Sequence, residues 1–542
     1  MRAGPTKITR AAVLAAVALA PDLSRAAAPL DLWTPEVLQK IRDQATLNLL
    51  MVQGPGYTDL FYDSEVGDAK WADSEPPYGV HTGDTIRIHG YLAVPPGRGP
   101  YPALVIGHGH RGKGSARLAQ ALALLGYVAL SIDGPSAGLS TGGPRDTEQA
   151  WLSVEEVENQ PSPEVSYLYH WAYAGMRALT LLESLAARPY NPYKIDPTRL
   201  GVVGASMGGQ FTYYINGIDD RVRAAVAIAV AGDWKNVMNY DGAWLYHGLY
   251  YYTRDGWRSG LDALNAVTGC DDPTFSTFLD YFDPIRYAPT QHAPLLTILG
   301  SNDQYFTIPA INTTFDRVAS AGTTERFRKE ILVVPNGEHG VLEGDESLGT
   351  VLILLETISR WLKFGFGEGR DPLQTPSIER TTAGNWMVFK VRTRPGATPI
   401  TRAYLSLASQ LDSTPKAPCD FVTVPLLRYG ENFYGFVKSG HAVPCGEPLA
   451  PDNVLYFASV TDEAGYTVSS KLYYADGEMT FRSGLVPRIQ HWPGDDLPVP
   501  PVPLCAADAA RDRETRSQES AVAEPAPVPT AATFSAHSPS GR

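Results

Sequence analysis

The pentapeptide GASMG (residues 204–208) has the G-x-S-x-G spacing that places a serine hydroxyl on a sharp turn. An apolar run at 200–203 leads into it, and a segment with helical periodicity follows from Gly208. The glycines allow the tight turn, and the strand and the helix then hold the hydroxyl clear of a sheet. Ser206 is therefore the candidate nucleophile. The alternative is a glycine-rich strand-to-helix connection without chemistry.

A serine hydroxyl becomes a good nucleophile only when a base accepts its proton. His339 is the candidate base, because it follows the apolar strand pattern at 331–335 in the loop NGEHG. Asp303 is the candidate acid that orients the imidazole, because it ends the loop GSND after the strand pattern at 295–299. Glu338 is the alternative acid, although a residue adjacent to the histidine rarely reaches round to its ring.

An acyl-transfer site also needs N–H donors for the negative charge that develops on the carbonyl oxygen. The backbone N–H of Met207 is one candidate, because it directly follows the nucleophile. The backbone N–H of His110 is the other, in the loop HGHRG (108–112) after an early strand. A metal site at His108 and His110 is the alternative interpretation, but no third ligand is apparent.

Short apolar strands alternate with helical segments over residues 85–364, a pattern typical of a mostly parallel sheet covered on both faces. A helix is also expected near the start of the chain, over 34–50. The expected strands are 85–95, 101–107, 127–132, 200–203, 224–230, 294–299 and 327–334. The expected helices of this part are 116–125, 167–187, one after Ser206, and 350–364.

Near residue 370 the long helical patterns stop. Expected strands at 386–392, 403–407, 421–427, 432–437, 454–460 and 466–474 follow one another. This pattern predicts an antiparallel β-sandwich over 375–488 behind a catalytic domain at 29–370. A tail rich in Pro, Ala and Ser at 490–542 is expected to be disordered.

Between residues 240 and 257 seven of eighteen side chains are aromatic. This segment lies inside a region of about 233–292 that separates two expected strands, where a cap over the site could be inserted. Tyr240, Trp244 and Tyr246 are the candidate pocket residues, because aromatic rings line apolar and sugar-binding pockets alike. The alternative is a cap helix that simply packs on the core.

Residues 1–26 have the features of an export signal: three early basic residues, a ten-residue apolar run and small-residue cleavage sites. A secreted or periplasmic location is therefore expected. The run is too short to span a bilayer, and no later segment approaches the length of a membrane span. The formal net charge is −13 without a basic stripe, which argues against a nucleic-acid partner.

The four cysteines are spaced so that no CxxC pair exists, and neither a zinc site nor a thioredoxin-like centre is supported. Cys419 and Cys445 are the expected disulfide, because they are 26 residues apart in the sandwich and export supplies the oxidant. A Cys270–Cys505 pairing is a weaker expectation. Buried free thiols are the alternative for all four.

Five blocks occur in a recognisable order: HGHRG, DGPSAG, GASMGG, GSNDQYF and PNGEHG. With these blocks, residues 85–365 resemble an α/β-hydrolase of the dienelactone-hydrolase and acetylxylan-esterase-like group. Dienelactone hydrolases have a cysteine nucleophile where this chain has Ser206, which favours ordinary esters. The blocks from NDQYFTIP to VVPNGEHG, with a sandwich behind them, also resemble more loosely the PhoPQ-activated pathogenicity-related proteins.

The resemblance and the residues together predict a serine esterase that acts on a small-molecule or polymer ester and requires no cofactor or metal. A secreted serine peptidase of the same fold is the alternative enzyme, although no propeller precedes the expected catalytic domain. A non-catalytic carbohydrate-binding or adhesion protein is the alternative from another class. Reaction with a fluorophosphonate distinguishes it from both enzymes.

Overall fold

The computed structural model describes residues 31–68, 81–143, 156–157, 160–234, 236, 273–303, 306, 308–322, 327–342, 348–394, 396, 398–409, 421–444 and 447–479. Several expectations fall outside these described residues. They are the leader (1–26), the aromatic candidates Tyr240, Trp244 and Tyr246, the four cysteines and the tail (490–542).

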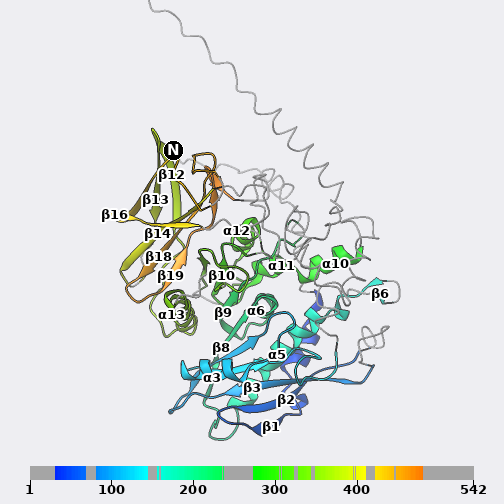
Figure 1. Ribbon diagram of the computed structural model, residues 1–542. Helices are drawn as coiled ribbons and strands as arrows, with labels where there is room; N and C mark the ends of the chain where they lie inside the picture. Colours follow the sequence, from blue (N-terminus) through cyan, green and yellow to red (C-terminus); the bar gives the residue numbers. More distant parts are fainter. Residues whose placement is uncertain are drawn as a thin grey trace, which may run out of the picture.

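A nine-stranded, mostly parallel sheet forms the centre of the first part of the chain (Figure 1). In sheet order its strands are β1 (Leu50–Gln53), β2 (Thr58–Val66), β3 (Thr85–Ala93), β5 (Val128–Ile132), β4 (Tyr101–Gly107), β8 (Ile195–Ala205), β9 (Val222–Ile228), β10 (Leu295–Gly300) and β11 (Lys329–Val334). The strands from β5 to β11 are parallel, and β1, β2 and β3 add antiparallel strands at one edge. Every residue of β5 and β10 is buried, because helices cover both faces.

Two helical layers produce this burial. On one face lie α3 (Ala116–Leu124) and α13 (Leu348–Gly365), and on the other lie α2 (Pro35–Arg42), α5 (Tyr167–Ala186), α6 (Met207–Ile218) and α12 (Ile308–Arg317). The helices α10 (Pro273–Phe282) and α11 (Pro284–Tyr287) also pack on the second face. A hairpin of two short strands, β6 (Glu156–Val157) and β7 (Gln160–Pro161), precedes α5. Among the described helices, none is long and apolar enough to cross a membrane.

The prediction of a helix over 34–50 is wrong beyond Arg42. α2 ends there, a 3₁₀ turn spans Gln44–Thr46, and β1 begins at Leu50. The buried side chain of Arg177, on α5, explains where the helix stops. Its guanidinium donates to the carbonyl oxygens of Ile41 (3.0 Å) and Asp43 (2.6 Å), so these carbonyls are bonded to a side chain and not to a further helical turn.

The last part of the chain forms two antiparallel sheets that pack as a sandwich, which confirms the expected fold class. One sheet contains β12 (Ser377–Ala383), β13 (Trp386–Arg392), β17 (Asn432–Lys438) and β16 (Leu427–Tyr429). The other contains β15 (Val422–Pro425), β14 (Ile400–Ala408), β18 (Leu455–Asp462), β19 (Thr467–Ser469), β20 (Tyr473–Tyr474) and β21 (Gly477–Glu478). The sequence reasoning missed β12 and joined β19 to β20.

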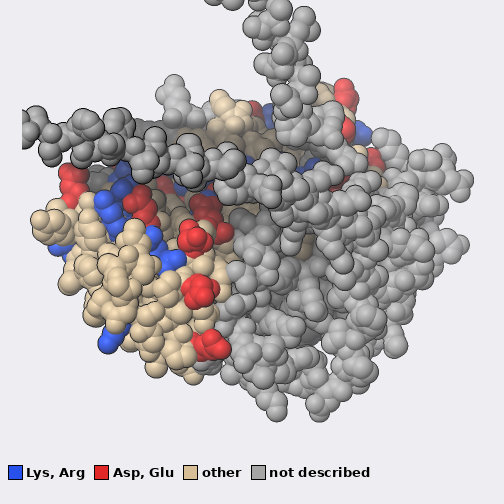
Figure 2. Space-filling view, turned by 90° about the horizontal axis from the view of Figure 1, so that it is seen from above, with Lys and Arg blue, Asp and Glu red and all other residues tan. Residues whose placement is uncertain are grey.

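The sandwich packs directly on the first part of the chain. Figure 1 shows its yellow and orange strands beside α13 and α12. Buried residues of the sandwich, such as Phe457 and Leu472, belong to the same apolar cluster as Phe315 of α12. In Figure 2, Lys and Arg side chains lie interspersed with Asp and Glu on the described part of the visible face.

Candidate active site

Ser206 lies on the turn between the end of β8 and the first residue of α6. Its backbone has φ 58° and ψ −121°, a left-handed conformation that costs a residue with a side chain on the order of 1–3 kcal/mol. The turn is held because the N–H of Ser206 donates to the carbonyl of Ile228 at 2.9 Å. A Cβ on Gly208 would lie 2.2 Å from the carbonyl oxygen of Gly107, so only glycine permits this close approach of α6 to β4.

The structure brings Ser206, His339 and Asp303 together from three loops. Nε2 of His339 lies 2.8 Å from the hydroxyl oxygen of Ser206, and Nδ1 lies 3.1 Å from both carboxylate oxygens of Asp303. Since the carboxylate accepts the Nδ1 proton, the lone pair of Nε2 faces the serine hydroxyl and can accept its proton. The Asp303 side chain is fully buried, and 19% of the His339 side chain is exposed. This arrangement can abstract a proton from the serine hydroxyl.

Backbone bonds join the loops that carry the acid and the base. The N–H of Ser301 donates to the carbonyl of Val334, and that of Asn302 donates to Gly337, each at 2.9 Å. The hydroxyl of Ser301 also accepts the N–H of Asn336 at 2.8 Å. The N–H of Phe306 donates to the Asp303 carboxylate at 3.0 Å and fixes its orientation. Asp303 and His339 are thus held as one unit.

The alternative acid, Glu338, lines a cavity between its loop and the sandwich. It is Asp303, and not its neighbour Glu338, that faces Nδ1 of His339 at hydrogen-bonding distance. The loop at 336–340 therefore directs His339 toward Ser206, whereas Glu338 lines the cavity between this loop and the sandwich.

The two segments that contain the expected N–H donors, the start of α6 and the HGHRG loop, lie beside the nucleophile. Met207 begins α6, whose N-terminus carries the partial positive charge of the helix dipole. The HGHRG loop passes beside the serine, because a Cβ built on Gly109 would lie 3.4 Å from Cβ of Ser206. The N–H of Gly112 donates to the carbonyl of Gly109 at 2.9 Å, which closes this loop into a turn. The donor role of His110 in that turn remains a prediction.

Both ring nitrogens of His108, the residue of the alternative metal site, are hydrogen-bonded to the backbone. Its Nδ1 donates to the carbonyl of Gly109 at 2.7 Å, and its Nε2 accepts the N–H of Gly134 at 2.9 Å. Its ring lies 4.7 Å from that of Trp171, and burial lowers its pKa. Both ring nitrogens are therefore bonded to the backbone, which leaves neither for a metal. In the part of the chain that the structure describes, no group of three or more His, Cys, Asp or Glu side chains is arranged so that it could hold a metal ion.

Asp133, in the DGPSAG block, is a positioning residue that the sequence reasoning did not single out. Its buried carboxylate accepts the N–H of Gly114 at 2.6 Å and that of Leu139 at 2.9 Å, so it fixes the end of the HGHRG loop. It also accepts Nδ1 of His89 at 2.8 Å, and Nε2 of His89 bonds to Asp59 at 3.1 Å. Burial lowers the pKa of His89, but the bonds and charges of these two carboxylates outweigh it and raise the pKa overall.

Asp283 holds the two ends of the expected cap region together. The chain leaves β9 and turns through Asp233, whose φ is 62°. The Asp283 carboxylate accepts the N–H groups of Asp233 (2.9 Å), Trp234 (2.7 Å) and Ile285 (3.1 Å). Burial raises the pKa of this carboxyl to about 8. The base of the insertion is therefore fixed on the side of the sheet where the candidate site lies.

Residues 155–363 match the family model of the PhoPQ-activated pathogenicity-related protein. Dipeptidyl-peptidase 5 of Porphyromonas gingivalis is 27% identical over 189 residues, which are 34% of this chain and 24% of that protein. The chain therefore spans about a quarter of the length of this relative.

Two solved acetyl xylan esterases are also similar in structure. The enzyme from a Thermoanaerobacterium species has 16% identity and a TM-score of 0.42, over 62% of this chain and 98% of that one. The enzyme from a Paenibacillus species has 17% identity and a TM-score of 0.43, over 63% and 99%. The strand order of the sheet and the strand–serine–helix turn show that this chain has the α/β-hydrolase fold.

Proposed function

We propose that this chain is a serine carboxylic-ester hydrolase in which Ser206 is the nucleophile, His339 the base and Asp303 the orienting acid. The observation that carries the proposal is the continuous chain of hydrogen bonds from the Ser206 hydroxyl through His339 to the buried Asp303. The positive φ of Ser206 also supports the proposal, because strained backbone conformations are concentrated at functional sites.

The reaction follows from these groups. His339 removes the proton as the Ser206 oxygen attacks the ester carbonyl, and the N–H groups of Met207 and His110 donate to the oxyanion. His339 then protonates the departing alcohol, which leaves an acyl group on Ser206. Water that gives its proton to His339 attacks the acyl carbonyl and releases the acid. None of these steps requires a metal or cofactor.

Cleavage of esters is favoured over cleavage of peptides on chemical grounds. A peptide has a poorer leaving group, and peptidases add contacts that hold an extended backbone. The similarity to a dipeptidyl-peptidase supports the peptidase alternative, but it covers only 34% of this chain. Assays of peptide anilides beside p-nitrophenyl acetate and butyrate distinguish an esterase from a peptidase. If the anilides are cleaved faster than the esters, the protein is a peptidase. The export signal expected at 1–26 would give the protein a secreted or periplasmic site of action.

The test uses the full chain and a fluorophosphonate probe. The wild-type protein should be labelled on Ser206 and hydrolyse p-nitrophenyl acetate. Ser206→Ala should abolish labelling and lower kcat by on the order of 10⁶. Circular dichroism and thermal melting provide the control that the variant is folded. A folded Ser206→Ala protein with retained activity would contradict the proposal, and a wild type that is neither labelled nor active would favour the non-catalytic alternative.

A further inference from the structure

The base loop, defined here as residues 335–340, lies between β11 and α13 and directly faces the sandwich. β11 is the last strand of the sheet, so one of its edges has no strand partner within that sheet. Ser469 of β19 partly covers this edge: its hydroxyl accepts the N–H of Val333 at 3.1 Å and donates to the Val333 carbonyl at 3.2 Å. The strand that leads into the base loop is thus bonded to the sandwich.

Asn336 makes a two-point contact from the base loop itself. Its side-chain oxygen accepts the N–H of Phe421 at 2.6 Å, and its side-chain nitrogen donates to the carbonyl of Phe421 at 3.1 Å. Its own backbone N–H donates at 2.8 Å to the hydroxyl of Ser301, in the loop at 300–303 that carries Asp303 and is called the acid loop here. Asn336 therefore joins the sandwich, the acid loop and the base loop three residues before His339. Its φ of 62° is a conformation that asparagine tolerates better than most residues.

A second asparagine makes the same kind of contact away from the base loop. The buried Asn312 of α12 accepts the N–H of Leu472 at 3.1 Å and donates to the carbonyls of Leu472 (2.7 Å) and Met479 (2.9 Å). An ion pair between Lys471 and Asp316 at 2.9 Å lies on the same side of the interface. Asn312 is therefore a matched comparison for Asn336. Its side chain also hydrogen-bonds to the backbone of the sandwich, but Asn312 lies on α12 and not in a loop that carries Ser206, Asp303 or His339.

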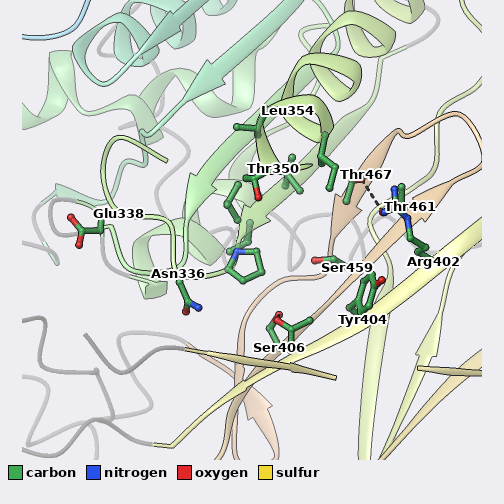
Figure 3. Close-up of a pocket in the computed structure, with 16 residues that line it drawn as sticks. Asn336, Glu338, Thr350, Leu354, Arg402, Tyr404, Ser406, Ser459, Thr461 and Thr467 are labelled. Carbon is green, nitrogen blue, oxygen red and sulfur yellow. Dashed lines mark hydrogen bonds between the residues drawn. The ribbon is translucent and has the colours of Figure 1, made fainter. Parts of the chain in front are cut away.

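The side of the base loop that faces the sandwich borders a cavity and is not closely packed. A cavity of about 550 Å³ separates the loop and α13 from the sandwich. Figure 3 shows Asn336 and Glu338 on one side of this cavity, and Arg402 and Tyr404 of β14 on the other. Because a cavity wall lacks contact atoms on one side, directional hydrogen bonds must fix the loop there.

We propose that the sandwich is part of the catalytic unit, and that Asn336 is a positioning residue through which it holds His339 in line with Ser206. The inference rests on the proposed hydrolase function. A base that moves by about 1 Å loses on the order of 100-fold in rate, and the side chain of Asn336 bonds the base loop to the backbone of the sandwich at Phe421.

The test compares Asn336→Gly with Asn312→Ala in the full chain. Glycine retains access to the positive φ while it removes the amide, so only the contact with Phe421 is lost. Asn336→Gly should lower kcat for p-nitrophenyl acetate by about 10- to 100-fold, with KM unchanged within about twofold, and should slow fluorophosphonate labelling by the same factor. Asn312→Ala should lower the melting temperature but leave kcat within about twofold.

Asn336→Asp provides a second measurement, because it preserves the acceptor for the Phe421 N–H but places a carboxylate oxygen against the Phe421 carbonyl, where the amide nitrogen donates in the wild type. Its kcat should be lower than that of the wild type. If Asn336→Gly does not fold, a wild-type kcat in Asn336→Asp overturns the inference. So does a wild-type kcat in Asn336→Gly, or an equal kcat loss in Asn312→Ala. A wild type that is neither labelled nor active contradicts the proposed function instead.

Discussion

Replacement of Asp303 by asparagine tests the role of the acid without a change of shape. The N–H of Phe306 donates to one carboxylate oxygen of Asp303 at 3.0 Å, and this donor should retain the amide oxygen of the asparagine at that position. The amide nitrogen then faces Nδ1 of His339, 3.1 Å away, and can donate to it. The amide oxygen lies equally close to Nδ1, so the tautomer depends on whether the amide donates, and donation places the His339 proton on Nε2, where the ring can no longer accept the proton of Ser206.

The expected loss follows from this change of tautomer. With the wrong tautomer, kcat should fall by about 10⁴, which corresponds to about 5.5 kcal/mol of transition-state stabilisation. The assay is steady-state hydrolysis of p-nitrophenyl acetate together with the rate of fluorophosphonate labelling, and both should fall by the same factor. KM should change little, because Asp303 is buried behind the histidine and does not reach the substrate.

Glu338→Gln is the matched control. Glu338 lies on the same loop as His339 but lines the cavity toward the sandwich, so its replacement should leave kcat within about threefold. The reasoning would be refuted if Asp303→Asn retained more than a tenth of the wild-type kcat. It would also be refuted if Glu338→Gln were the variant that loses activity, because the acid would then be Glu338.

Three further predictions concern stability and covalent structure. The pKa of His89 is raised in the folded state, so its contribution to the free energy of unfolding should be complete below about pH 6.5 and be lost as the pH rises through the pKa of the folded protein. Urea unfolding of the wild type and of His89→Gln between pH 6 and 9 measures this contribution. Gly208→Ala should destabilise the fold by about 3 kcal/mol or more, because its Cβ would meet the backbone of Gly107, and thermal melts would show it. Cys419 and Cys445 should form a disulfide, which non-reducing peptide mapping would disprove by finding either thiol free.

The sequence alone was sufficient to predict which residues the structure brings together around Ser206. Parallel strands end at one edge of a sheet, so the loop after each strand must lie near the others, and the strand assignments placed Asp303 and His339 in such loops. The HGHRG loop follows the same rule. Fold class could be predicted for the same reason, since runs of buried aliphatic residues alternate with helical periodicity.

Other features depended on contacts between distant residues and could not be predicted. The early helix ends because Arg177, more than a hundred residues later, binds its terminal carbonyls. Asn336 is an unremarkable loop asparagine until Phe421 lies beside it. His89 lies in a strand pattern that gives no sign of the two carboxylates on its ring. In each case the partner is fixed by tertiary packing, which a local pattern does not contain.

The contact of Asp283 with Trp234 has a consequence for how this chain could diversify. The chain leaves the sheet at the end of β9 (Ile228) and returns to it at the start of β10 (Leu295), and between these strands the backbone N–H of Trp234 is 2.7 Å from the carboxylate of Asp283. A segment whose ends lie so close together can be lengthened, shortened or exchanged with little effect on the strands that it connects. If Tyr240, Trp244 and Tyr246 line the substrate pocket as the sequence predicts, exchange of the stretch between Trp234 and Asp283 would change specificity and leave Ser206, Asp303 and His339 in place. The junction would then be the point at which to graft the corresponding segment of a related protein.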